Sequence, residues 1–404
     1  MSVPESPNGR AAVPRIGLVV GILVLASSTS IMSTDMYSPS LPDLAKWFDT
    51  TPSNVKLTIS LNMLAFGLAQ LLHGPLSDRF GRRPVILCSL VSVAILCVGC
   101  ALAQTIEQLI AMRILLGIAA AAEAVVGLAI LKDLYDEQQQ VKALALLGMV
   151  IAVTPAVAPI AGGYLHVAFG WQSNFYVISG MALLSAGIVA AMLPESAVID
   201  EQGLKVKRVL QGYGRLLANG DFLVHSSMLG VGMGLIFVFV TGAPFVLIDY
   251  LGVPIDHFGY YQASIVAAFF FGSVLASRLA DHWPGGRLLH FGVAVITIGA
   301  IALTIIVLTD ALSPWRFAGA YSIMTFGMGP LFAVAPSRAL RSIEGQAGIA
   351  AALLTGIEQI TAGLAALAIS LANDGTARPM VWVTLFMLCL LLLQLKVSRR
   401  WSSA

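Results

Sequence analysis

Long apolar stretches recur along the whole chain and alternate with short polar segments. Each stretch is long enough to cross the ~30 Å hydrocarbon core of a bilayer as an α-helix. Helices suit this environment because their backbone polar groups are satisfied within the segment. The pattern therefore predicts an all-α integral membrane protein with twelve transmembrane helices. The predicted spans are 15–38, 55–75, 84–103, 108–131, 141–166, 172–193, 222–248, 257–280, 287–308, 314–336, 346–372 and 378–396.

The polar segments divide the chain into two halves of six spans each. The longest polar segment, 194–221, is expected to be a cytoplasmic linker between an N-terminal bundle, 1–193, and a C-terminal bundle, 222–404. A polar loop around Pro42 and Lys46 is expected after the first span. That span lacks an Ala-x-Ala cleavage signal, which favours a membrane helix over a signal peptide.

Composition agrees with a membrane protein. Hydrophobic residues make up 58% of the chain and charged residues only 11%, whereas soluble domains carry about 25% charged residues. The net charge of +2 indicates no nucleic-acid partner. The four cysteines lie inside apolar spans and show no metal-binding spacing, so we expect no disulfide, no metal and no cofactor.

Basic residues gather on one side of the predicted topology. Only Lys46, Lys56, Arg316 and Arg378 fall on the other side, and Arg113 lies within a span. The positive-inside rule makes the basic side cytoplasmic. We therefore expect a multi-pass protein of the cell (inner) membrane with both termini in the cytoplasm. The basic residues assigned to the cytoplasm are Arg10, Arg15, Arg79, Arg82, Arg83, Lys132, Lys142, Lys205, Lys207, Arg208, Arg215, Arg278, Arg287, Arg338, Arg341, Lys396, Arg399 and Arg400.

A short, strongly basic segment, Gly74–Pro84, joins the second and third spans. Its glycines allow a tight turn, and Pro84 suits the first turn of the following helix. A less complete version, 277–287, lies at the equivalent place in the second half, which favours two related halves. The segment predicts a cytoplasmic gating loop whose key residues are Gly74, Asp78, Arg79, Gly81, Arg82 and Arg83.

Two ionisable residues fall close to the outer ends of spans. Asp35 lies near the end of the first span and Arg113 near the start of the fourth. Ionisable groups at membrane depth are costly and indicate function by default. Asp35 is a candidate for taking up and releasing protons, and Arg113 for holding an anion or biasing a neighbouring group. The alternatives are that Asp35 caps a helix at the interface and that Arg113 extends to the outer surface.

Further polar residues lie deeper in the spans. Glu123 lies near the middle of the fourth span, about 15 Å along the helix axis from Arg113. It is a candidate for carrying a proton or holding a cationic substrate, or it is a protonated structural residue. Glu358 in the eleventh span presents the same choice, and the sequence does not say whether either faces a cavity. Asn62, Gln70 and His73 on the second span either line a cavity or bond across helices.

The fifth span carries prolines and glycines at close spacing. Prolines are tolerated in membrane helices and bend them, and small residues let neighbouring helices approach closely. The span therefore predicts a rigid, close-packed hinge, formed by Pro155, Pro159, Gly162 and Gly163. The alternative is ordinary packing of small residues.

Taken together, these stretches resemble the Bcr/CflA group of drug/proton antiporters within the major facilitator superfamily. The resemblance covers nearly the whole chain and is carried by 35–42, 74–84, 113–117, 132–136, 158–163 and 335–340. It implies two six-helix bundles around a central cavity. It also implies that Asp35 and Arg113 lie in this cavity and take part in proton coupling, and that Pro159 and Gly163 belong to a motif associated with exporters.

The resemblance implies proton-coupled efflux of small amphipathic molecules, such as antibiotics, by alternating access. The chain departs from the family pattern at Ala158, which replaces a glycine, and at Glu123, where a small residue is expected. A dedicated exporter of an endogenous siderophore or dipeptide is an alternative, and the proline–glycine pattern disfavours a proton-coupled importer. Because no catalytic dyad, nucleotide-binding loop or metal motif is present, we expect no enzyme. The expected partners are the small-molecule substrate, protons and the bilayer, with the chain acting as a monomer.

Overall fold

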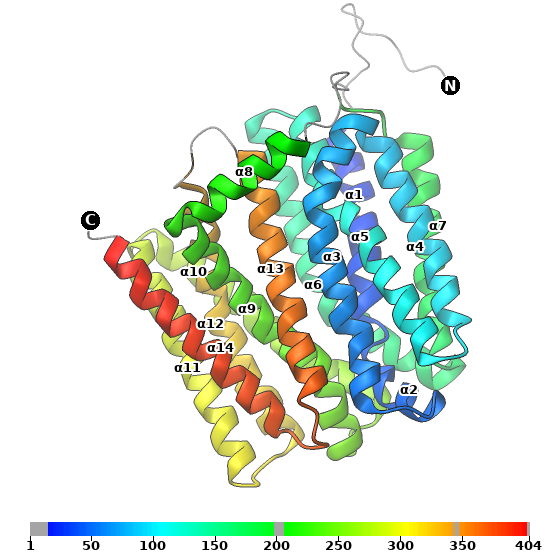
Figure 1. The fold of residues 1–404 in the computed structure, drawn as a ribbon, viewed down its shortest axis with the longest axis vertical. Helices are drawn as coiled ribbons and strands as arrows, with labels where there is room; N and C mark the ends of the chain where they lie inside the picture. The colour runs from blue at the N-terminus through cyan, green and yellow to red at the C-terminus, as the bar shows by residue number, and fades with distance from the viewer. Residues whose placement is uncertain (1–14, 198–205, 342, 344–346, 402–404) are drawn as a thin grey trace, which may run out of the picture.

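The computed structural model describes residues 15–197, 206–341, 343 and 347–401 (Figure 1). Arg10 and Lys205, assigned above to the cytoplasmic side, lie outside the described residues. Twelve helices in the described ranges are long and apolar enough to cross a membrane, which confirms the twelve-span prediction. The elements of the first half are α1 (Ile16–Asp35), η1 (Ser38–Ser40), α2 (Leu41–Trp47), α3 (Pro52–Phe80), α4 (Arg82–Ala101), α5 (Ile106–Leu134), α6 (Glu137–Phe169) and α7 (Gln172–Met192).

The second half continues the same alternation of long helices and short connections. Its elements are α8 (Val206–Ala218), α9 (Gly220–Pro244), η2 (Phe245–Tyr250), η3 (Ile255–His257), α10 (Phe258–Ala280), α11 (Gly285–Leu308), α12 (Pro314–Arg341), α13 (Ala347–Leu371) and α14 (Arg378–Trp401).

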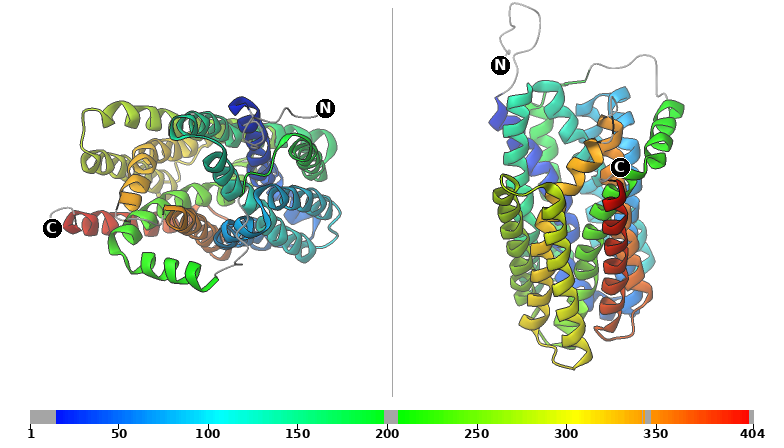
Figure 2. Two further views of the ribbon diagram at one scale, coloured as in Figure 1. Left: turned by 90° about the horizontal axis from the view of Figure 1, so that it is seen from above. Right: turned by 90° about the vertical axis from the view of Figure 1, so that its left-hand side faces the viewer.

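Most packing occurs between helices of the same half. In the first half α3 and α4 pack along α5, and α1 packs on α6; in the second, α12 packs on α10 and α11, and α9 on α13. Seen from above, the two groups of helices lie next to each other (Figure 2). Two seams join them, α3 against α13 and α6 against α10.

The two ends of the molecule are distinguished by different elements. The described parts of the chain that lead to both termini reach one end, together with α8 and the turn between α3 and α4 (Figure 1). Because Gly81 forms this turn, we call this end the Gly81 end. The short helix α2 lies at the opposite end, which we call the α2 end. The elements η2 and η3 contact α2 and α6 there.

The Gly74–Pro84 segment is mostly helical, so the predicted loop is wrong in extent. Helix α3 continues to Phe80 and α4 begins at Arg82, which leaves only Gly81 outside a helix. Gly81 has a φ of 95°, a conformation that favours glycine. Asp78 and Arg82 form an ion pair of 2.6 Å across this turn. The polar residues here belong to the last helical turns of α3, which extend beyond its apolar stretch, and they do not mark the end of the helix.

Two other predicted polar connections also contain helices. The loop after the first span holds η1 and α2, whose Leu41 and Leu44 are buried. The linker 194–221 holds α8, whose Tyr213 and Leu216 pack in an apolar cluster with side chains of α9 and α13. Both helices are short and amphipathic, and their few apolar residues are hidden among polar neighbours in the sequence.

Candidate functional site

A cluster of buried polar side chains lies where α1, α3 and α5 meet. Asp35 is the last residue of α1. The helix ends there because Pro39, four residues later, has no N–H to donate to the Asp35 carbonyl. Asp35 is only 6% exposed, and among the described residues its carboxylate has no hydrogen bond and no ion pair. A buried carboxylate without a partner can take up a proton or hold a cation.

Arg113 projects from α5 into the same cluster and is completely buried. Its Nη1 donates to the Ser33 carbonyl at 2.6 Å and its Nε to the Thr58 carbonyl at 3.3 Å. The guanidinium lies 4.5 Å from the centre of the Tyr37 ring, a cation–π geometry. Its Nη2 has no partner in the described structure. The extended position at the outer surface, considered as an alternative, is therefore not the one adopted.

Hydrogen bonds between the helices fix the surroundings of this arginine. Asn62 donates to the Arg113 carbonyl at 2.6 Å. A side chain at Gly117 would overlap the Asn62 carbonyl, so glycine permits this close approach of α3 and α5. The Tyr37 and Thr58 hydroxyls lie 2.8 Å apart. Asn62 thus bonds across helices, one of the two roles considered from the sequence.

The two charged residues of the cluster do not form an ion pair, because no nitrogen of Arg113 lies within 4.0 Å of an Asp35 oxygen. The guanidinium is charged at any physiological pH and is held by carbonyls and an aromatic ring. Asp35 is therefore free to change its protonation or its partner without breaking a contact to Arg113. The arrangement places a fixed positive charge near a carboxylate whose charge can change.

Glu123 lies apart from this cluster in the interior of the first half. It is 1% exposed, its Oε1 lies 3.5 Å from the Ser89 hydroxyl on α4, and its Oε2 has no partner among the described residues. Glu358 is half-buried on α13, in the other half, and has no hydrogen bond or ion pair within the described ranges. The structure thus brings Asp35 and Arg113 together and leaves the two glutamates in separate places.

The predicted hinge on α6 contacts both halves through adjacent glycines. A side chain at Gly162 would overlap the carbonyl of Met36, next to Asp35 in the chain. A Cβ at Gly163 would lie 2.7 Å from the Ile255 carbonyl oxygen, in η3 of the second half. Residue 162 therefore sets the packing of α6 beside Asp35, and residue 163 sets the contact between the halves.

A proline of α6 also creates a hydrogen bond between the halves. Pro159 lacks the N–H that would bond to the Pro155 carbonyl in an unbroken helix. Gln262 of α10 donates to this carbonyl at 3.3 Å. A backbone acceptor left free inside the first half is thereby satisfied by a side chain of the second.

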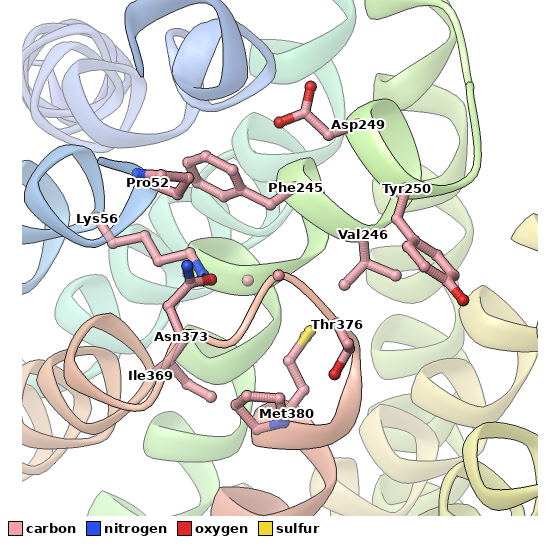
Figure 3. A pocket seen from close by; sticks show the side chains of 13 residues that line it. Pro52, Lys56, Phe245, Val246, Asp249, Tyr250, Ile369, Asn373, Thr376 and Met380 are labelled. Carbon is pink, nitrogen blue, oxygen red and sulfur yellow. Dashed lines mark hydrogen bonds between the residues drawn. The ribbon is translucent and has the colours of Figure 1, made fainter. Parts of the chain in front are cut away.

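Further contacts between the halves close the α2 end. The Lys56 ammonium donates to Asn373 Oδ1 at 2.6 Å and lies 4.7 Å from the centre of the Phe245 ring. Figure 3 shows Lys56 extending toward Asn373 beside a cavity of about 170 Å³. Lys46 and Asp249 form a further ion pair of 3.7 Å between the halves. Lys56 is 4% exposed, so this closure buries a charge.

Comparison with known proteins identifies the family. The sequence model of the Major Facilitator Superfamily matches residues 23–393. The chain belongs to this superfamily. It is 30% identical to the bicyclomycin resistance protein homolog of Haemophilus influenzae over 372 residues, 90% of this chain and 91% of that protein. It is 29% identical to the chloramphenicol resistance protein of Pseudomonas aeruginosa over 372 residues, 91% and 88% of the two chains.

A solved structure shows the same fold. The partially occluded inward-open xylose transporter XylE from E. coli matches with a TM-score of 0.72 at 16% identity, over 94% of this chain and 96% of that chain. The predicted major facilitator fold and the predicted resemblance are thereby confirmed. The chain is a multi-pass membrane transporter of this superfamily and not an enzyme.

In this superfamily member the basic turn, the Gly74–Arg83 segment that joins α3 to α4, is bonded to residues of its own half. Arg82 bonds to Asp133 on α5 at 3.1 Å and to Asp78 at 2.6 Å. The Glu195 carboxylate, just beyond α7, accepts from the backbone N–H groups of Arg82 and Arg83 at 2.9 and 3.2 Å. These contacts hold the α3–α4 turn against the ends of α5 and α7.

Several residues of the transporter's site were not selected from the sequence. Tyr37, Thr58 and Gln262 carry no charge, and the sequence does not show which side chains from distant spans approach them. Lys56 was assigned to the outer side by topology alone. Its position at the start of a span, without a basic neighbour, is the signal that could have indicated a buried contact.

Proposed function

We propose that this transporter exports small amphipathic molecules, including antibiotics, across the cell (inner) membrane in exchange for protons. Two relatives are named for resistance to bicyclomycin and chloramphenicol, which supports drug efflux. The observation that supports the proton-coupled part is the position of Asp35, a buried carboxylate that has no partner among the described residues and lies beside the fixed charge of Arg113. Asp35 and Arg113 would form the substrate and proton site, with Glu123 as a second proton-carrying carboxylate.

The positive-inside rule assigns the Gly81 end to the cytoplasm. The contacts of Lys56, Gly163 and Gln262 then lie on the outer side, and we propose that they close it while the transporter accepts substrate from inside. On this assignment both termini are cytoplasmic. The residues of the basic turn, from Gly74 to Arg83, act at the cytoplasmic side as a gating segment.

The cycle follows from the change of charge on Asp35. When the site faces outward, Asp35 takes up a proton, loses its charge and releases a substrate that it held by hydrogen bonds or a positive charge. A neutral carboxyl is cheaper to bury than a carboxylate, so protonation favours reclosure of the outer side. When the site faces inward, substrate binding favours release of the proton to the cytoplasm.

Transport in proteoliposomes tests this proposal. The experiment measures uptake of bicyclomycin, chloramphenicol and an iron chelator into vesicles in which the cytoplasmic face points outward, with and without a proton gradient. We expect gradient-dependent uptake of several compounds, and its loss in Asp35→Asn. The matched control is Asp310→Asn, an exposed loop residue with a φ of 52° that asparagine tolerates.

Three outcomes count against the proposal. Gradient-driven uptake that persists in Asp35→Asn would remove Asp35 from proton coupling. Uptake of the chelator alone would indicate a dedicated metabolite exporter. Uptake only in vesicles of the opposite orientation would indicate an importer.

A further inference from the structure

The Leu71 carbonyl of α3 has lost its helical partner. In an unbroken helix it would accept a hydrogen bond from the N–H of residue 75, but that residue is Pro75. Buried backbone carbonyls in proteins almost always find another donor. Here the donor is the Tyr213 hydroxyl of α8, which lies 3.0 Å from the Leu71 oxygen.

This hydrogen bond joins the linker helix to the first half. The Tyr213 ring belongs to an apolar cluster with Phe222 of α9 and Leu353 of α13, so α8 packs on the second half. Its hydroxyl, in contrast, reaches α3 of the first half. Burial raises the pKa of Tyr213 above its ordinary value of 10.0, so the hydroxyl keeps the proton that it donates.

The bond lies at one end of the α3–α13 seam. Three glycines in this seam allow close approach of the two helices, and the contact of Gly356 with Leu71 is the one nearest the Gly81 end. A rotation of one half against the other therefore changes the distance from Tyr213 to Leu71. The seam itself has little freedom to adapt, because a Cβ at Gly67 would lie only 2.8 Å from the Ile360 backbone nitrogen.

The second seam repeats the arrangement. The Pro155 carbonyl, freed by Pro159, accepts its hydrogen bond from Gln262 of the other half. In both places a proline leaves an acceptor that belongs to no helical hydrogen bond. Such an acceptor can gain or lose a partner while the helix around it keeps its own bonds.

We propose that the Tyr213–Leu71 hydrogen bond is a strap that fastens α8 to the first half while the α2 end is closed. The strap is released when that end opens, and Pro75 provides its acceptor. The proposal rests on the alternating-access cycle proposed above. It depends on neither the molecule transported nor the role of Asp35.

A double-mutant cycle with spin labels tests the strap without a transport assay. Labels at Gln104 and Thr309, exposed positions at the α2 ends of the two halves, report the opening of that end. The protein is reconstituted in lipid nanodiscs with the exposed Cys88 and Cys389 replaced by serine. The measured quantity is the ratio of long to short label distances, that is, of open to closed molecules.

Tyr213→Phe is expected to raise this ratio about fivefold, the factor that corresponds to one net hydrogen bond. In a Pro75→Ala background, the N–H of residue 75 again donates to the Leu71 carbonyl. In that background Tyr213→Phe is therefore expected to raise the ratio of open to closed molecules by less than half of the fivefold change. Tyr176→Phe, which alters an exposed tyrosine of α7 without a hydrogen bond in the described structure, is the matched control and is expected to leave the ratio unchanged.

Two results of the spin-label measurement would overturn the proposal. One is an unchanged ratio in Tyr213→Phe; the other is an equal rise in both backgrounds, because the hydroxyl would then not act through the proline-freed carbonyl. Hydrogen–deuterium exchange of the α8 amides provides a second measurement for a variant that labels poorly. We expect faster exchange in Tyr213→Phe, and exchange at the wild-type rate would also contradict the strap.

Discussion

At the scale of single residues, the permanent charge of Arg113 is kept out of contact with the Asp35 carboxylate, whose charge can change. Arg113 is held by two backbone carbonyls and the Tyr37 ring, and it needs no carboxylate to remain buried. Asp35 lies nearby and has no hydrogen bond or ion pair within the described part of the chain. A tight ion pair between them would stabilise both charges and resist protonation of the acid. The open arrangement suits the role proposed for Asp35, in which the acid gains and loses a proton in each cycle.

Replacement of Arg113 by lysine tests the importance of this geometry. An ammonium group cannot reach the Ser33 and Thr58 carbonyls together or lie flat over Tyr37. We expect Arg113→Lys to lower proton-driven transport about tenfold or more, and to lower the free energy of unfolding by about 1–3 kcal/mol because a buried carbonyl is left unpaired. Transport in proteoliposomes and thermal unfolding measure the two effects.

Tyr37→Phe is the matched comparison for this lysine variant. It keeps the ring beneath the guanidinium and removes only the hydroxyl that lies 2.8 Å from Thr58. We expect it to retain most of the transport activity. Equal losses in the two variants would mean that the guanidinium geometry is not what matters.

At the scale of elements, α6 packs against residues of both halves. One face packs beside Asp35 through Gly162, and the other packs on η3 through Gly163. Its prolines leave the helix continuous from Glu137 to Phe169. The helix therefore connects the site to the contact between the halves without an intervening loop.

Alanine substitutions along α6 separate these two faces. We expect Gly162→Ala to lower the unfolding temperature, because its methyl group would overlap the rigid Met36 carbonyl. We expect Gly163→Ala to weaken the contact with η3 and to increase the fraction of molecules open at the α2 end. Thermal unfolding and the distance between spin labels at that end measure these effects.

The matched control for both alanine variants is Gly148→Ala. It lies on the same helix, and a Cβ there meets nothing within 4 Å. It is expected to be neutral or to stabilise the protein by up to ~1 kcal/mol through helix propensity. If all three variants behaved alike, helix propensity and not packing would explain them.

The sequence predicted the spans well because membrane helices follow apolar length alone. It also selected Asp35 and Arg113, because charges in apolar stretches are rare and conspicuous. It misjudged the turn at Gly81 and missed α2 and α8, because short amphipathic helices and polar helical turns look like loops. Contacts such as Tyr37 with Thr58 or Gln262 with Pro155 depend on how distant spans are packed, and no local pattern contains that information.

At the scale of the whole molecule, the α2 end is held closed by a few contacts between the halves. Two lysines contribute in different environments. Lys56 is buried, with a charged hydrogen bond to Asn373 and the Phe245 ring nearby. The side chain of Lys46 is 71% exposed and lies 3.7 Å from Asp249. Buried charged hydrogen bonds contribute more than exposed ion pairs.

Removal of each lysine tests this ranking. We expect Lys56→Ala to raise the ratio of open to closed molecules about tenfold, the lower range for a hydrogen bond to a charged group. We expect Lys46→Ala to change it less than about twofold. The ratio of open to closed molecules is measured by the rate at which a cysteine, introduced at the α2 end of the α3–α13 seam, is labelled. A larger effect from Lys46 would show that surface charge and not the buried contact keeps this end closed.

The cavity beside Lys56 has a pharmacological consequence. Residues of both halves line it, among them Pro52 and Lys56 of the first half and Val246 and Thr376 of the second (Figure 3). On the proposed orientation it faces the outside, so an inhibitor could reach it without crossing the membrane and without being a substrate. A compound bound there would hold the two halves together and arrest the cycle. A resistance mutation at Lys56 would escape such a compound only by weakening the closure on which the transporter itself depends.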